Sequence, residues 1–464
     1  MNVICIQEQG RLSDRDRQRH HAFPFSVPPD SARLRIHFRF APGAVGAFQN
    51  LLTLSLFDPL GFRGAAHRWQ VEQEVFVAGG QATPGFFPGP VYAGEWQVVI
   101  DAHEILNDGE GRGWCEYELA VTAEVQPGDT PAVTDPRRRV AGPTQVRRKP
   151  GWYKGDLHSH SVHCDGGSTV TDMARAAASR GLNFLALTSH NTLSWLASDT
   201  TWPEGLLAVR GMECTMFFGH ANVLGIKEWI DWRTPRRAFG VRTIIEQAHR
   251  QEALFVVNHP CAVGNPACTG CHWDFIGTDF SQVDGFEIWN GPWRAEGIYN
   301  PAALELWTDL LNEGFRVTAI AGTDNHHAEQ YWQKDIPFTW VYVEGLGERE
   351  ILRALSQGRA FLSCGPEIYF TARTPGGFET SLPGDSIPRN ESATLAVEVR
   401  ELAPPATLWL VSDGASNGSW NLQPPGGRVT IEQVSPHRWC RLELRQGYDA
   451  EGDLLALTNP LYKE

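Results

Sequence analysis

The stretch TVTDMARAAASRGLNFLALTSH (169–190) joins a helix-type segment to a strand-type segment. Threonines and an aspartate that can cap a helix come first, helix-forming alanines follow, and Gly181 is suited to end the helix. The next run, NFLALTSH (183–190), is short and apolar and closes on a histidine. A helix that leads directly into a buried strand is the repeating unit of α/β proteins, so this stretch predicts an α/β fold around it.

The alternation of helix-type and strand-type segments continues toward the C-terminus. Further strand-type runs are HANVLGI (220–226), ALFVVNH (253–259), GFEIWN (285–290) and VTAIAGTDNH (317–326). Helix-type segments are VRTIIEQAHRQ (241–251), ALELWTDLLNEG (303–314) and EREILRALSQG (348–358). This alternation predicts a barrel or an open parallel sheet over residues 152–370.

The two flanks of this region lack helical periodicity. RLRIHFRFA (33–41), GEWQVVI (94–100) and EYELAVTAEV (116–125) predict a sandwich-like β domain over 1–126. Three strand-type runs after residue 370, ATLAVEVRE, ATLWLVSDG and WCRLELRQG, predict a small β module over 371–464. Between the first two domains, 127–151 is rich in Pro, Gly and Arg and predicts a solvated linker, because no aromatic residues interleave its arginines as in a nucleic-acid patch.

Charge and composition exclude several classes of protein. With 40 basic and 54 acidic residues the net charge is −14, which argues against a general binder of nucleic acid or anionic membranes. No apolar run approaches the ~20 residues that span a bilayer, and the N-terminus has no signal-peptide pattern. Nine cysteines, an odd number, are scattered along the chain and do not resemble a disulfide framework. We therefore expect a cytoplasmic protein and leave its oligomeric state open.

Metal-capable side chains concentrate at the ends of the predicted strands. In GDLHSHSVHCDGG (155–167), His158 and His160 are two residues apart, so on a strand both point to the same face. Each such residue alone could be an ordinary hydrogen-bonding group, but nine of them in one domain predict a multinuclear metal site at the carboxyl ends of the strands. The nine are His158, His160, Asp165, His190, Glu213, His220, His259, Asp324 and His326.

Five motifs in this order resemble the polymerase-and-histidinol-phosphatase (PHP) superfamily: DLHSH…DGG, LALTSHN, GMEC…HANVLG, VVNHP and IAGTDNH. GRAFLSCGP (358–366) and LALTNPLY (455–462) are similar to its carbaryl-hydrolase-like branch. The resemblance implies a distorted (β/α)7 barrel that binds up to three divalent ions. It implies a first site of His158, His160, Glu213 and Asp324, a second that shares Glu213 and adds His220 and His259, and a third of Asp165, His190 and His326.

Imidazoles with few carboxylates suit two or three ions of Zn, Mn or Fe. One departure from the family is Ser189, which stands where an acid often precedes the histidine, and this puts the third site in question. Asp156 is a candidate partner for the histidine pair, whereas His163, His327 and Cys164 are expected not to be ligands. For Cys268 and Cys271 we favour free thiols in a structural loop, with a disulfide or a structural zinc as alternatives.

The function that these features predict is hydrolysis of a small anionic ester. The first hypothesis is a phosphoesterase that attacks a phosphate mono- or diester with a metal-bridging hydroxide, with Glu213, Asp324 and His326 as catalytic residues. The second is an aryl carbamate or carboxylic ester hydrolase with the same metals, in which Trp289, Trp293 and Trp332 could line an aromatic pocket. The third is a non-catalytic, metal-stabilised binding protein. In all three we expect the terminal β segments to pack outside the barrel and to supply no ligand.

Overall fold

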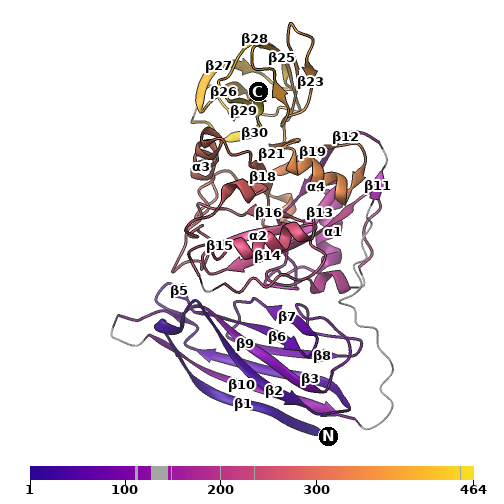
Figure 1. Cartoon of the computed structure of the whole chain (residues 1–464), viewed down its shortest axis with the longest axis vertical. Helices are drawn as coiled ribbons and strands as arrows, with labels where there is room; N and C mark the ends of the chain where they lie inside the picture. Colours follow the sequence, from indigo (N-terminus) through magenta and orange to yellow (C-terminus); the bar gives the residue numbers. More distant parts are fainter. Residues whose placement is uncertain (110–112, 127–144, 148, 199, 235, 450) are drawn as a thin grey trace.

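The computed structural model describes residues 1–109, 113–126, 145–147, 149–198, 200–234, 236–449 and 451–464. It stacks three bodies along the long axis of the molecule: an N-terminal β body, a central body that carries the α-helices, and a C-terminal β body (Figure 1). Most of the predicted linker (127–144 and 148) lies outside the described residues. Within the described part of the chain, no helix is both long and apolar enough to cross a bilayer.

The N-terminal body consists of two four-stranded antiparallel sheets that share one hydrophobic core. The first sheet has the order β1 (Asn2–Ser13), β10 (Trp114–Val125), β3 (Ser31–Ala41), β8 (Glu72–Ala78). The second has the order β2 (Arg19–Val27), β9 (Gly94–Glu104), β6 (Leu51–Asp58), β7 (Gly61–Ala66), and β4 (Ala44–Val45) pairs with β5 (Phe48–Gln49) apart from both. Strand β3 buries Leu34, Ile36, Phe38 and Phe40 and turns its arginines outward, as its alternating sequence predicts. This arrangement is compatible with the sandwich-like domain expected from the sequence.

The central body is built on one curved sheet. Its strands run in the order β18 (Thr318–Gly322), β17 (Gly285–Asn290), β16 (Leu254–Val257), β15 (Gly219–Leu224), β14 (Leu207–Met216), β13 (Phe184–Leu187), β12 (Gly151–Asp156), β19 (Phe338–Val343), β21 (Ala360–Ser363). The α-helices are α1 (Val170–Ser179), α2 (Arg242–Arg250), α3 (Asn300–Glu313) and α4 (Glu348–Ser356), each within a predicted helix-type segment or overlapping it. Short 3-10 helices are η1 (Asp14–Asp16), η3 (Ser194–Ala197), η4 (Phe280–Gln282) and η5 (Ala328–Trp332). A separate pair joins β11 (Gln145–Arg147) to β20 (Leu346–Gly347).

The distorted (β/α)7 barrel that the resemblance implied is not shown by the described residues. The described residues form four α-helices, and the ladders from β14 to β15 and from β15 to β16 are antiparallel. The physical reason is local: an antiparallel pair needs only a tight turn, whereas a parallel pair needs a crossover of a dozen or more residues. The sheet nevertheless curls until β18 meets β19, where the Thr339 hydroxyl accepts a bond from the Ala321 amide (3.0 Å) and donates to its carbonyl (2.8 Å).

The C-terminal body is partly an extension of the central sheet. Strand β21 pairs with β30 (Leu454–Thr458), and the ladder continues through β29 (Trp439–Gln446), β26 (Ala406–Ser412) and β27 (Ala415–Leu422), with β31 (Leu461–Lys463) and β24 (Ser386–Ile387) beside it. A second sheet has the order β23 (Glu379–Thr380), β22 (Glu367–Arg373), β25 (Ala393–Arg400), β28 (Gly427–Val434). The expected domain boundary at 370/371 falls inside β22. The two C-terminal sheets share a hydrophobic core.

Candidate metal centre

One edge of the central sheet brings the nine predicted ligands together. Most of them follow the carboxyl ends of strands, whereas Glu213 lies within β14 and His220 lies at the amino end of the antiparallel strand β15. The segment after β12 runs parallel to the segment after β18, because the His160 amide donates to the Asn325 carbonyl and the Asp324 amide donates to the His158 carbonyl, both at 2.8 Å. This pairing sets the rings of His158 and His160 beside Asp324, with ring centroids of the two histidines 5.2 Å apart. His259 and Asp324 have positive φ angles of 27° and 54°, a backbone conformation that residues other than glycine rarely adopt.

Glu213 lies at the middle of the cluster, and its two carboxylate oxygens face different imidazoles. Oε2 lies 3.4 Å from Nε2 of His158, 3.4 Å from Nε2 of His160 and 2.9 Å from Nδ1 of His190. Oε1 lies 3.3 Å from Nδ1 of His220 and 3.6 Å from Nε2 of His259. One carboxylate therefore has two separate sets of nitrogen donors around it.

Asp165 lies between His190 and the remaining histidine of the cluster, His326. Its Oδ1 atom lies 3.4 Å from Nε2 of His190 and 3.3 Å from Nε2 of His326. Asp324 connects this group to the first, since its Oδ1 atom lies 2.9 Å from Nε2 of His160 and 3.8 Å from Nδ1 of His326. The structure thus arranges the predicted third set around Asp165, next to the other two.

The donor atoms that face the interior of the cluster fit divalent metal ions. Buried polar atoms normally have a hydrogen-bond partner. Five ligand atoms here are buried without one: Nε2 of His158, Nε2 of His160, Oδ1 of Asp165, Oε2 of Glu213 and Oδ1 of Asp324. Two ligands that each lie about 2.1 Å from a shared ion are roughly 3.0 to 3.5 Å apart, which matches most of the separations above. The donor chemistry and the spacing both fit a metal centre.

The second nitrogen of most rings is held by an outer partner, which leaves the inner nitrogen free for a ligand. Nδ1 of His158 lies 3.0 Å from Oε1 of Glu287, and Nδ1 of His160 lies 3.4 Å from Sγ of Cys164. The carbonyl oxygens of Cys271, Thr269 and Asp324 hold His259, His220 and His326 at 3.1, 3.0 and 2.8 Å, respectively. These contacts give the imidazoles defined orientations.

Electrostatics keep the carboxylates of the cluster ionised. Burial by itself raises the pKa of Glu213, but the neighbouring His190 and His158 outweigh it and hold that pKa well below the usual range. Burial likewise raises the pKa of Asp324, but His158 beside it outweighs this effect and brings the pKa of the carboxyl well below its ordinary value. Burial lowers the pKa of His160 to about 3, helped by the nearby His190 and His326, so this ring is neutral at physiological pH. Burial opposes the charged forms of His158 and His190, but the carboxylates around them raise the pKa of both rings well above the ordinary value. These two imidazoles would release a proton on binding a metal, because only the neutral ring is a ligand.

Sequence reasoning missed two polar side chains around Glu213 and His158. Glu287, in the middle of β17, contacts His158 and accepts a bond from the His259 amide at 3.0 Å. Asn258 donates to Oε1 of Glu213 at 3.1 Å. A carboxylate inside the apolar run GFEIWN was the available signal for Glu287, because a buried charge needs a partner. The Asp156 side chain supports the backbone of the site, because its carboxylate accepts hydrogen bonds from the backbone amides of His158 and Thr323.

Cys268 and Cys271 form a disulfide, so the preference for free thiols was wrong. The two cysteines close a short loop whose Thr269 and Cys271 carbonyls hold His220 and His259, as described above. Spacing alone could not distinguish a thiol pair from a disulfide, because the pairing depends on how the loop bends. Cys164 stays a free thiol and contacts His160 through its sulfur.

The neighbours of His190 differ from those in the family pattern. The Ser189 hydroxyl is buried and has no hydrogen-bond partner among the described residues. Nδ1 of His190 lies 2.5 Å from the Thr215 hydroxyl and 2.9 Å from Oε2 of Glu213, and these contacts orient the ring. His327 is exposed, and neither it nor His163 lies in the cluster; His163 contacts the Ser194 hydroxyl at 2.8 Å.

The N-terminal body reaches the cluster through two buried histidines. His67, which follows β7, is buried, and its ring centroid lies 4.6 Å from that of His190. His103, on β9, contacts His67 edge-on at 4.8 Å and stacks on Trp232 at 5.9 Å. Burial lowers the pKa of both imidazoles well below the ordinary value, helped for His67 by the adjacent His190. No pattern in the first 126 residues pointed to these two histidines.

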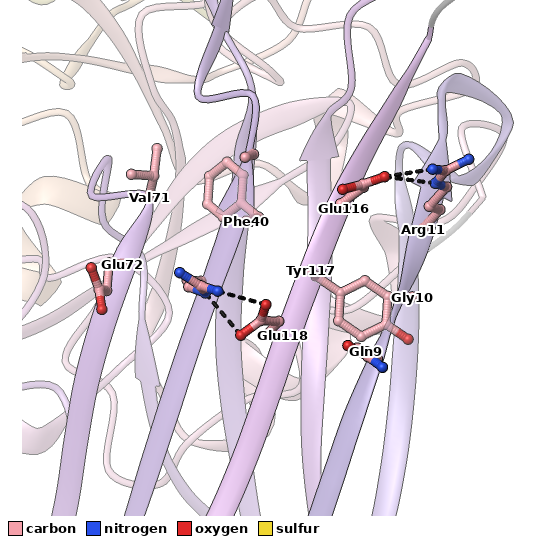
Figure 2. A pocket seen from close by; sticks show the side chains of 11 residues that line it. Gln9, Gly10, Arg11, Phe40, Val71, Glu72, Glu116, Tyr117 and Glu118 are labelled. Carbon is pink, nitrogen blue, oxygen red and sulfur yellow. Dashed lines mark hydrogen bonds and ion pairs between the residues drawn. The ribbon is translucent and has the colours of Figure 1, made fainter.

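The three tryptophans that were expected to line an aromatic pocket do not form one together. Trp289 and Trp293 are buried in the hydrophobic core and contact each other edge-on at 5.3 Å, whereas Trp332 is exposed. A hollow of about 590 Å³ lies elsewhere, on the outer face of the first N-terminal sheet (Figure 2). Its charged side chains are already paired, Arg11 with Glu116 and Arg39 with Glu118. This hollow contains none of the predicted ligands.

Known proteins offer only a distant likeness to this chain. No protein-family model matches the chain, and no curated protein matches it. One solved structure to which the chain is similar is a two-domain protein from Bacteroides vulgatus, described as containing a predicted PHP-like metal-dependent phosphoesterase. The match has 19% sequence identity and a TM-score of 0.38, and covers 67% of this chain and 96% of that chain. A likeness this weak assigns no function, so the function has to be inferred from the chemistry of the site.

Proposed function

We propose that this protein is a metal-dependent hydrolase of the PHP type that cleaves phosphate esters of small molecules. The observation that carries the proposal is the position of Glu213, whose two oxygens face separate sets of imidazoles. A carboxylate in this position can bridge two cations and offset their mutual repulsion. The assignment to the PHP type rests on the sequence motifs that carry these ligands.

The ligand sets follow the contacts of the cluster. His158, His160, Glu213 and Asp324 would hold one ion, Glu213 with His220 and His259 a second, and Asp165 with His190 and His326 a third. Imidazole-rich donors favour Zn, Mn or Fe over Mg or Ca. When bound, such ions lower the pKa of a coordinated water and stabilise the charge that builds up on a phosphoryl group during hydrolysis.

Exposure of the ligands indicates the side from which a substrate approaches. The side chains of Asp324 and His326 are 22% and 29% exposed, whereas those of the other seven are at most 9% exposed. The ester would therefore enter past Asp324 and His326. The His326 ring is oriented there by its contact with the Asp324 carbonyl, and this places its other nitrogen toward Asp165.

A phosphate ester is favoured over a carbamate or carboxylic ester. A cluster of cations attracts an anion even in a protein whose net charge is −14, because the ions reverse the local field. The feature that had favoured an aryl substrate is weakened, since Trp289 and Trp293 belong to the core.

The proposal is tested by metal content and by paired assays on the purified protein. Elemental analysis should find two to three equivalents of Zn, Mn or Fe, and the metal-loaded protein should hydrolyse bis(4-nitrophenyl) phosphate or 4-nitrophenyl phosphate. Turnover of 1-naphthyl acetate or 1-naphthyl methylcarbamate without either phosphate would favour the ester or carbamate alternative. Metal that raises the melting temperature without any turnover would favour the binding-protein alternative.

A further inference from the structure

A cavity of about 340 Å³ lies where the N-terminal body meets the metal centre. The central body contributes the loop that follows His160, including Cys164 and the predicted ligand Asp165. The N-terminal body contributes Arg68, Gln70 and Gln73. The cavity therefore lies between the segment that carries the predicted ligand Asp165 and polar side chains of a different domain.

Arg68 is tied to both walls of this cavity. Its Nε atom donates to the Cys164 carbonyl at 3.2 Å, and Nη2 donates to the carbonyls of Val162 (3.3 Å) and Pro84 (2.5 Å). Within the described part of the chain, no carboxylate lies within ion-pairing distance of the guanidinium and Nη1 has no hydrogen-bond partner. The arginine is partly exposed, so its positive charge and two of its donors are available to the cavity.

The segment that carries Arg68 is already in contact with the cluster. The preceding residue, His67, packs its ring against His190, one of the histidines around Asp165. Two glutamates also line the cavity, but both are exposed and both face His37, with Oε1 of Glu72 3.0 Å and Oε1 of Glu74 3.7 Å from its Nε2. The positive group lies next to the loop that bears the metal ligands.

We propose that Arg68 is a specificity-determining residue that binds an anionic oxygen of the substrate ester, so that the N-terminal domain completes the substrate site. This inference rests on the proposed function. A guanidinium is the side chain best suited to phosphate oxygens, because its donors form a rigid planar fork. Backbone carbonyls orient the fork here, which leaves Nη1 for the ligand.

The test compares an anionic with a neutral substrate in Arg68→Ala and Arg68→Lys, with Arg11→Ala as the matched control. Arg11 lies in the same domain on β1, at the opposite edge of the first sheet from β8, is paired with Glu116 and does not line the cavity. For bis(4-nitrophenyl) phosphate, Arg68→Ala should raise KM by roughly 10- to 100-fold with little change in kcat, and Arg68→Lys should raise it less. KM for 4-nitrophenyl acetate and the metal content should not change, and added guanidinium should partly restore the Ala variant.

An equal change for both substrates, or a loss of metal, would overturn the inference and make Arg68 a clamp for the 162–166 loop. If the wild-type protein hydrolyses neither substrate, the proposed function fails, but Arg68 is still tested by titrating the metal-loaded proteins with inorganic phosphate. Weaker phosphate binding in Arg68→Ala than in Arg11→Ala then supports the anion site. Equal binding refutes it.

Discussion

The ring of His67 in the N-terminal domain lies 4.6 Å from the ring of His190 in the central domain. Behind His67, His103 is fully buried, and neither of its ring nitrogens has a hydrogen-bond partner among the described residues. Two uncharged imidazoles thus separate the sandwich core from the metal cluster. Their burial has a consequence for acid stability.

We expect the protein to lose stability as pH falls below about 6.5, the ordinary pKa of an unfolded histidine. Burial lowers the pKa of His67 and His103 in the folded state, so below that pH the unfolded chain binds more protons and folding becomes less favourable. The melting temperature should differ less between pH 8 and pH 5 in His103→Phe than in the wild-type protein. Each kcal/mol of linked free energy corresponds to roughly 2 to 4 °C in melting temperature. His437→Phe, at an exposed position, is the control; an equal change in both variants would contradict the expectation.

Glu213→Gln keeps the size of the side chain but removes the charge between the two sets of imidazoles. We expect the loss of at least one metal equivalent and a fall in turnover of at least ~10²-fold, because an amide is a poor bridge between cations. His327→Ala should keep its metal and most activity, since that side chain is exposed and outside the cluster. Metal stoichiometry and phosphodiester hydrolysis measure both. A fully metallated and active Glu213→Gln protein would rule out the bridging role.

Glu287→Gln tests the outer support of His158. The carboxylate lies 3.0 Å from Nδ1 of His158 and also accepts the His259 amide, so its loss should weaken the orientation of both rings. We expect metal affinity to fall by about 10- to 100-fold while the circular dichroism spectrum of the metal-free protein is unchanged. The exposed Glu296→Gln provides the control. Competition with a chromogenic chelator measures the affinity, and an unchanged value would remove Glu287 from the centre.

The disulfide loop should also affect metal affinity. The Cys271 carbonyl holds His259, and the Thr269 carbonyl, between the two cysteines, holds His220. In the double variant Cys268→Ser/Cys271→Ser the loop is less constrained, so we expect one metal equivalent, held by these two histidines with Glu213, to dissociate several-fold faster. Cys261→Ser, which removes a free cysteine nearby, should have no effect. Identical dissociation rates in the double variant and the wild type would contradict this role.

Residue type and position along the chain were sufficient to predict which side chains lie together. The structure brings the nine side chains proposed as ligands into one cluster, because most of them follow strands that share one edge of a sheet. The four central helices were also predictable, since capping residues and helix formers act locally. These features depend on interactions over a few residues.

Tertiary structure decided the features that depend on contacts between distant segments. Glu287 contacts His158 because the curved sheet brings β17 close to the segment that follows β12, which no local pattern records. The antiparallel pairing of β15 with β14 and β16 interrupts the expected parallel sheet, and the Cys268–Cys271 pairing depended on how its loop folds. His67 and Arg68 come from a domain whose sequence indicates only a sandwich. Their positions beside the metal ligands result from domain packing, which buries side chains according to shape and therefore cannot be inferred from periodicity.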